Sequence, residues 1–133
     1  MSVRVLLDTC ALLWTANGDP IDSTASATLD QAAEVAVSPI TAWEVGQLVA
    51  RGQIALPMPP AAWFDTCLES GVTLAAMPPD VLIASSFLPG PPLRDPADRI
   101  VVATARAYGY VLMTRDASIL AAGEAGHLKT LAC

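Results

Sequence analysis

The sequence has little of several residue types on which common active sites depend. It contains one histidine, His127, and three cysteines, none of them in a CxxC pair. These counts exclude an HExxH zinc site and any centre with two histidine ligands, and they argue against a zinc ribbon or a disulfide framework. Three cysteines without a pairing pattern are typical of a reducing compartment, so we predict a cytoplasmic protein.

Positive charge is also scarce. Seven Lys and Arg residues stand against thirteen Asp and Glu residues, which gives a net charge of −6. This balance excludes a broadly basic nucleic-acid-binding surface, although it leaves room for a local basic site.

Long hydrophobic runs are missing, although hydrophobic residues make up 53% of the chain. The longest charge-free stretches, residues 52–64 and 81–93, contain prolines and are shorter than the roughly 20 apolar residues that a spanning helix needs. We therefore expect no membrane segment. The start of the chain lacks a basic region followed by an apolar one, so no signal peptide is expected either.

The length of 133 residues suits a single domain over residues 1–133. Short apolar runs predict strands that alternate along the chain with helical segments. The expected strands are 3–7, 35–37, 72–75, 110–113 and 127–131, and the expected helices are 26–33, 40–50, 61–69, 80–87, 96–108 and 117–122. This alternation predicts an α/β fold with a mainly parallel sheet, in which sites lie at the carboxyl ends of the strands.

Four carboxylates occupy positions where burial would be costly. Asp8 and Asp116 come at or just beyond predicted strand ends, Glu44 lies on an apolar stripe of its helix, and Asp98 opens the helix 96–108. Gathered in one cleft, they would repel each other until a cation binds. Oxygen ligands favour Mg²⁺ or Mn²⁺ over zinc, and the chain has few basic residues to serve instead. A metal site is the interpretation that we favour.

Taken singly, most of these acids also suit a structural role. Asp95, directly before Pro96, is a good N-cap, and Asp98 then sits in the first turn, where a carboxylate favours a helix start. Asp116 could cap the following helix, and Asp8 could bind nearby turn amides. Glu44 is the hardest to explain in this way, because it lies well inside its helix.

The segments around these acids resemble the PIN-domain ribonucleases, in particular the VapC toxins of prokaryotic toxin–antitoxin systems. The similarity is carried, in order, by Leu-Leu-Asp-Thr at 6–9, SPITAWEV at 38–45, RDPADRIVVATA at 94–105 and Met-Thr-Arg-Asp at 113–116. Each motif alone is weak. Four of them in the right order, over nearly the whole chain, are fairly specific.

The resemblance implies a three-layer α/β/α sandwich and a Mg²⁺- or Mn²⁺-dependent endoribonuclease toxin neutralised by a VapB-like antitoxin. It also implies homodimers and toxin–antitoxin hetero-oligomers. Matched position by position, the catalytic and metal-binding acids are Asp8, Glu44, Asp98 and Asp116, while Thr114 and Asp95 support the site. Relatives often have histidine at the positions of Cys10 and Leu93, which puts in doubt any substrate contact made there.

We hypothesise that the acids hold one or two ions, which activate a water to attack an RNA phosphodiester. Arg94, Arg99, Arg106 and Arg115 bracket the site in sequence, and arginine suits phosphate. We predict RNA contacts for Arg99 and Arg115, whereas Arg106 could equally pair with acidic neighbours on the surface.

Two other functions stay open. An aspartate-dependent phosphatase or phosphoryl acceptor also places aspartates at strand ends, but it needs a second aspartate at position 10 and a lysine near the site; the sole lysine is Lys129. The second alternative is a non-catalytic PIN-like module for protein interaction. Trp63 and Phe64 are either core residues or part of a surface groove for a partner.

Overall fold

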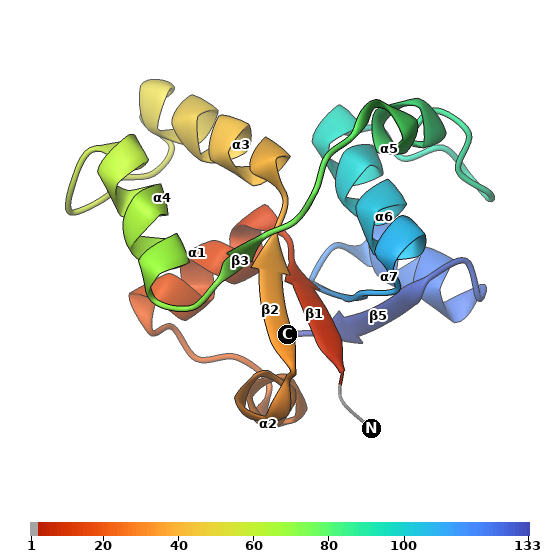
Figure 1. Cartoon of the computed structure of the whole chain (residues 1–133), viewed down its shortest axis with the longest axis horizontal. Helices are drawn as coiled ribbons and strands as arrows, with labels where there is room; N and C mark the ends of the chain where they lie inside the picture. The colour runs from red at the N-terminus through yellow and green to blue at the C-terminus, as the bar shows by residue number, and fades with distance from the viewer. Residues whose placement is uncertain (1–2) are drawn as a thin grey trace.

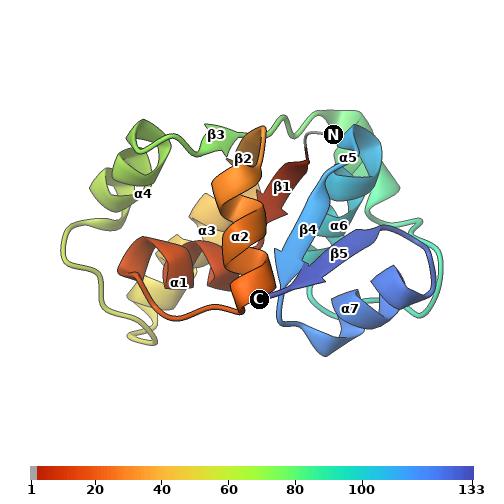
Figure 2. The same ribbon diagram turned by 90° about the horizontal axis from the view of Figure 1, so that it is seen from below.

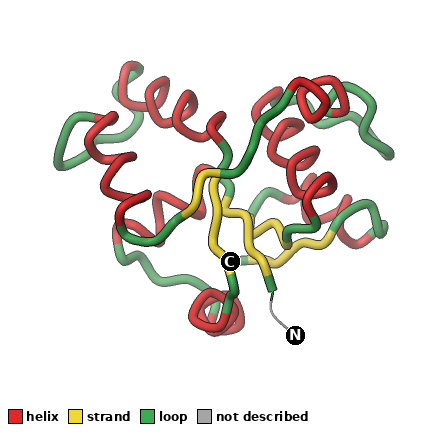
Figure 3. The backbone as a smooth tube through the Cα atoms, viewed as in Figure 1, coloured by secondary structure: helices red, strands yellow, loops and turns green. Residues whose placement is uncertain are grey.

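A computed structural model describes residues 3–133, which form five strands and seven helices (Figures 1 and 3). The strands are β1 (Arg4–Leu7), β2 (Glu34–Val37), β3 (Thr73–Leu74), β4 (Val111–Thr114) and β5 (Lys129–Ala132). The helices are α1 (Thr9–Asn17), α2 (Ser23–Gln31), α3 (Pro39–Ala50), α4 (Pro60–Glu69), α5 (Pro79–Ala84), α6 (Pro96–Tyr108) and α7 (Ala117–Glu124).

The strands form one sheet in the order β3-β2-β1-β4-β5, and every pair of neighbours is parallel. The predicted mainly parallel sheet is therefore confirmed. Leu7 of β1 is in register with Val37 of β2 and Met113 of β4. Because these three strands end together, the residues that follow them meet at one edge of the sheet.

Two hydrophobic cores lie on the two faces of the sheet, as the alternation of side chains along a strand requires. Val5 and Leu7 point into a core with residues of α1, α2, α3 and α4. Leu6 and Leu112 point the other way, against α6 and α7. Figures 1 and 2 show these helices on opposite sides of the strands. The three-layer α/β/α arrangement is thus confirmed.

Most helices begin at residues that suit a helix start. Asp8, Asp22, Ser38, Asp95 and Asp116 are N-caps, and each side chain accepts a hydrogen bond from a backbone N–H of the first turn. Proline occupies the first helical position of α3 and α6. The end of α6 at Gly109, with φ of 71°, also agrees with the prediction.

Helix α1 was not predicted. Its sequence, TCALLWTAN, buries Thr9, Ala11, Leu12 and Leu13, so no clean helical stripe separates apolar from polar positions. The predicted helix 26–33 instead runs over Ser23–Gln31, because Asp22 caps it, and the predicted helix 80–87 ends at Ala84. Trp63 and Phe64 belong to the core, which decides between their two interpretations. Within residues 3–133, no helix has both the length and the apolar character to cross a membrane.

Candidate active site

A pocket of about 270 Å³ lies where β1 and β4 end and α1 and α6 begin. All four predicted catalytic acids line it, and so does Asp95. The complete lining is Asp8, Thr9, Cys10, Trp14, Glu44, Asp95, Asp98, Arg115 and Asp116. We call this the acid pocket. Five carboxylates and a single guanidinium therefore face one small volume.

Asp8 is the most firmly held of these acids, with 9% of its surface exposed. Its Oδ1 accepts a hydrogen bond from the Ala11 N–H at 2.7 Å, and its Oδ2 accepts one from the Thr114 hydroxyl at 2.6 Å. Burial raises the pKa of Asp8 above its usual range and the charge of Asp116 raises it further, against the effect of those two hydrogen bonds. Hydrogen bonds thus hold both carboxylate oxygens of Asp8 in a fixed orientation.

Glu44 reaches the pocket from the middle of α3. Its Oε1 accepts a hydrogen bond from the Thr9 hydroxyl at 2.5 Å, and the Thr9 Oγ1 lies 3.4 Å from the Thr41 Oγ1. Burial, followed by the charges of Asp95 and Asp8, raises the pKa of Glu44. A half-buried carboxylate inside a helix caps nothing, so its position has no structural explanation of the kind that the other acids have.

Asp98 and Asp116 differ in how they are held. Asp116 caps α7 through Ile119 N, 2.9 Å from its Oδ1, and its own N–H donates to Thr114 Oγ1 at 3.0 Å. No hydrogen bond to the Asp98 carboxylate is present within residues 3–133. Burial raises its pKa to about 7, with further contributions from the charges of Asp95, Asp116, Glu44 and Asp8. The charge of every other acid of the pocket therefore contributes to the raised pKa of Asp98.

Residues 5–125 match the PIN domain family. The chain belongs to the PIN-domain family. It is 35% identical, over 84% of its length and 86% of the relative, to the Mycobacterium tuberculosis protein "Ribonuclease VapC22".

Solved structures share the fold of this PIN domain at low sequence identity. VapBC2 of Rickettsia felis, solved with a DNA fragment from its promoter, has a TM-score of 0.71 at 14% identity over 98% of this chain and 99% of that one. FitAcB of Neisseria gonorrhoeae has a TM-score of 0.57 at 19% identity over 96% of each chain. At these identities the likeness establishes the fold.

The PIN domain also places three residues in the acid pocket that were not predicted to line it: Thr9, Cys10 and Trp14. All three belong to α1, so the missed helix explains the omission. Burial and the charges of Asp8, Glu44 and Asp98 raise the pKa of the Cys10 thiol to about 11. Cys10 is therefore a neutral thiol at the pocket wall.

The two arginines predicted to contact RNA have different surroundings. Arg115 lines the acid pocket, with its guanidinium 3.7 Å from the centre of the Trp14 ring and its Nη2 donating to the Pro20 and Cys133 carbonyls at 3.2 and 3.0 Å. Arg99 lies outside that lining, and its Nε and Nη2 donate to the carbonyls of Leu93 and Arg94 at 2.6 and 3.0 Å. Arg99 thus braces the loop before α6.

Arg106 and Leu93 also have defined surroundings. The Arg106 Nη1 donates to the His127 carbonyl, so it pairs with backbone rather than with an acidic neighbour. Leu93 is half-buried and packs against the core that contains α6. The side chain at position 93 is thus directed into the fold and lies outside the lining of the acid pocket.

The donor set of the acid pocket fits a hard divalent ion, because it consists of carboxylate oxygens with a raised pKa at Asp8, Glu44 and Asp98. Within residues 3–133, no three His, Cys, Asp or Glu side chains are grouped so that they could hold a metal ion as they stand. A bound cation would offset the mutual repulsion of these carboxylates.

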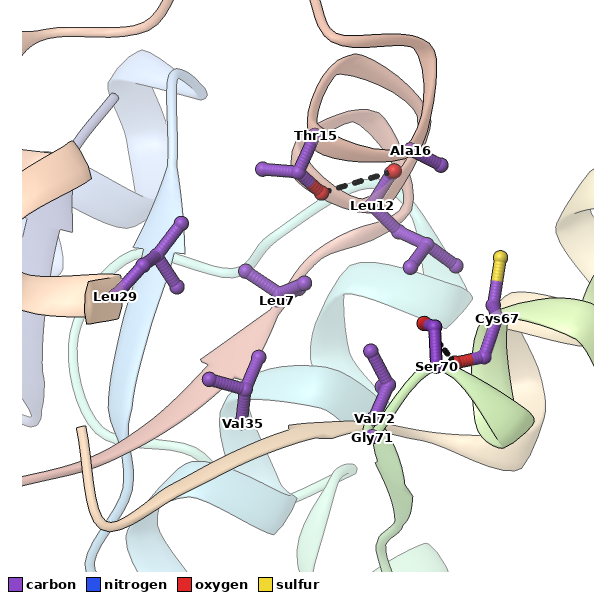
Figure 4. Close-up of a pocket in the computed structure, with 10 residues that line it drawn as sticks. All are labelled: Leu7, Leu12, Thr15, Ala16, Leu29, Val35, Cys67, Ser70, Gly71 and Val72. Atoms are coloured by element: carbon purple, nitrogen blue, oxygen red, sulfur yellow. Dashed lines mark hydrogen bonds between the residues drawn. The ribbon is translucent and has the colours of Figure 1, made fainter. Parts of the chain in front are cut away.

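A second pocket, of about 280 Å³, has a different chemistry (Figure 4). Its wall includes side chains from β1, β2 and three helices, among them Leu7, Leu12, Leu29 and Val35, with Cys67 at one side. The hydroxyls of Thr15 and Ser70 donate to carbonyls of their own chain segments, Leu12 and Cys67. The pocket is therefore apolar and carries no carboxylate.

We predict that Thr114→Val destabilises the protein by about 1–3 kcal/mol, because it leaves a buried Asp8 oxygen and the Asp116 N–H without a partner. Urea unfolding measures this difference. Thr114→Ser keeps the hydroxyl and is the matched control. Equal stability of Thr114→Val and wild type would show that the hydroxyl does not hold Asp8.

Proposed function

We propose that this protein is a Mg²⁺- or Mn²⁺-dependent endoribonuclease toxin. The observation that carries the proposal is the acid pocket, in which Asp8, Glu44, Asp98 and Asp116 share one small volume that a single arginine borders. Further support comes from the 35% identity to a protein named a ribonuclease.

Asp8, Glu44, Asp98 and Asp116 would hold one or two divalent ions, with Thr114 and Asp95 supporting them. When bound, such an ion supplies a Lewis acid that activates water and stabilises negative charge on phosphate oxygens. Thr114 and Ala11 hold both Asp8 oxygens in a fixed direction, and Thr9 does the same for one oxygen of Glu44.

The second oxygen of Glu44 and the Asp98 carboxylate have no hydrogen-bond partner within residues 3–133, so both can turn toward a ligand. Without an ion, the pKa of Asp98 is about 7, so an ion that binds near neutral pH would displace a proton from this carboxyl group. No histidine is needed as a base near the site.

The proposal is tested by incubating purified protein with RNA. We expect cleavage in Mg²⁺ or Mn²⁺, none in EDTA, and none for Asp8→Asn, whose amide cannot supply the charge of the carboxylate. Asp80→Asn, at an exposed position of α5, is the matched control and should retain full activity. Cleavage that persists in EDTA would overturn the proposal.

Arg115 would hold an RNA phosphate at the mouth of the acid pocket. Its stacking on Trp14 and its two carbonyl contacts fix the guanidinium in place.

We predict that Arg115→Ala weakens RNA binding and reduces the slope of log affinity against log salt by about 1. Trp14→Leu removes the stacking but keeps the charge, so it should preserve the slope. An unchanged slope in Arg115→Ala would argue against a phosphate contact. The same test applied to Arg99, which lies outside the lining of the acid pocket, should show a smaller change.

We also propose that the chain forms homodimers and binds a VapB-like antitoxin in the cytoplasm. Ile83 in the last turn of α5 and Phe87, three residues after its end, are 61% and 81% exposed, and such apolar surface is typical of a covered interface. The mass in solution, measured by light scattering with and without Phe87→Ser, tests the dimer. Titration with the product of an adjacent antitoxin gene tests the complex.

A further inference from the structure

A third pocket, of about 500 Å³, brings two cations and an imidazole together in an otherwise acidic protein. It is lined by Ala105, Arg106, Gly109, Tyr110, Gly126, His127, Leu128 and Lys129. The lining contains three of the eight basic residues of the chain (seven Lys and Arg and one His), namely Arg106, His127 and Lys129. No Asp or Glu belongs to the lining. We call this the basic pocket.

The basic pocket lies far from the acid pocket. Val111 and Lys129 are in register at the amino ends of β4 and β5, whereas Asp8 and Asp116 follow the carboxyl ends of their strands. Asp98 in the first turn of α6 and Gly109 directly after its end are eleven positions apart, which corresponds to about 16 Å at a rise of 1.5 Å per residue. Figure 2 shows β5 beside β4 at this side of the sheet, with α6 and α7 next to them.

The cations of the basic pocket are not neutralised within the fold. Among residues 3–133, the ion pair between Arg4 and Glu34 is the only one within 4.0 Å. One N–H of the Arg106 guanidinium donates to the His127 carbonyl. This hydrogen bond connects α6 to the turn before β5 and fixes the position of the guanidinium. Lys129 is exposed at the start of β5.

The dipole of α6 explains only part of this arrangement. Arg106 lies in the last turn of α6, where a cation is favourable. Lys129 lies on a strand, so the α6 dipole does not account for it. A guanidinium, an ammonium and an imidazole around one hollow form a donor set that suits phosphate oxygens. The volume also falls in the range of pockets that hold small ligands.

We propose that the basic pocket binds a phosphate group, carried either by a phosphorylated small molecule or by an RNA chain. Apart from their own chain neighbours, neither Gly109 nor Gly126 has an atom within 4 Å of where a Cβ would be. Both glycines therefore leave their side of the pocket open to a ligand, and their amides serve as local reporters.

Titration of ¹⁵N-labelled protein with pyrophosphate, in EDTA so that no ion occupies the acid pocket, tests this. We expect saturable shifts of the Gly109 and Gly126 amide resonances, with no shift at Gly46 or Gly52 on and after α3. Lys129→Glu should weaken the affinity by at least about tenfold. Arg51→Glu makes the same change in net charge at an exposed position after α3, and should leave the affinity unchanged.

Absence of the glycine shifts, or an equal loss in Arg51→Glu, would overturn the proposal. If Lys129→Glu does not fold, as thermal unfolding would reveal, Lys129→Gln takes its place. A second arm uses a single-stranded RNA oligonucleotide in the same buffer. Shifts at the same glycines and competition with pyrophosphate assign the phosphate to RNA, whereas pyrophosphate shifts alone assign it to a small molecule. RNA cleavage is not the readout, so the result is independent of the function proposed for the acid pocket.

Discussion

Asp98→Asn is expected to lower the rate of RNA cleavage in Mn²⁺ by at least about 10²–10³-fold. The carboxylate lines the acid pocket, has no hydrogen-bond partner within residues 3–133, and is influenced by the charge of every other acid there. It is therefore the acid most available for an ion. Asparagine preserves the size of the side chain but removes the charge. Single-turnover cleavage of RNA by the purified variant measures the effect.

Asp95→Asn is the matched comparison, because Asp95 borders the same pocket but also caps α6 through Ala97 N at 2.9 Å. Asparagine is a good N-cap, so this variant should fold normally and lose less activity than Asp98→Asn. Expression in cells gives a second readout: wild type should arrest growth and Asp98→Asn should not. Equal cleavage rates for Asp98→Asn and wild type would show that the Asp98 carboxylate takes no part in the reaction.

Asp98→Asn is also expected to stabilise the metal-free protein, and more so at pH 8 than at pH 5. The pKa of Asp98 is raised from 3.8 to about 7 on folding, so the folded state binds its proton more tightly than the unfolded state. Stability contributed by this group is full at low pH and falls as the pH rises from about 4 to about 7. Above that range the charged carboxylate opposes folding, and asparagine removes the penalty.

Thermal unfolding in EDTA at the two pH values measures this difference. Each kcal/mol gained should raise Tm by a few degrees, roughly 3–5 °C for a chain of this size. Asp80→Asn is the control for the loss of one negative charge at the surface. A variant that is less stable than wild type at pH 8 would show that Asp98 is a stabilising residue rather than one held for function.

The sequence predicted most of the acids that line the acid pocket, because the signals that mark them are local. Asp95 and Asp116 precede helices and cap them, and Asp8 ends an apolar strand, so parallel-strand geometry brings Asp8 and Asp116 to one edge. Glu44 was recognisable because an acid on an apolar helical stripe is costly. The structure places all of these in one pocket with Asp98.

The parts that were missed depend on packing between distant segments. Trp14 reaches the pocket only because α1 starts directly after β1, and no amphipathic stripe signals that helix. The two carbonyls that hold Arg115 belong to residues 20 and 133, far from it in sequence. The meeting of Arg106 with His127 and Lys129 likewise joins segments that are about 20 residues apart in sequence.

Direct titration with Mn²⁺, followed by electron paramagnetic resonance of the free ion, tests the central claim that the acid pocket is a metal-dependent catalytic centre. We predict that wild-type protein binds one or two ions per chain, that Asp98→Asn loses this binding, and that Asp80→Asn retains it. A wild-type protein that binds no Mn²⁺ at millimolar concentration, or one whose binding survives Asp98→Asn unchanged, would contradict the claim and favour a non-catalytic PIN domain.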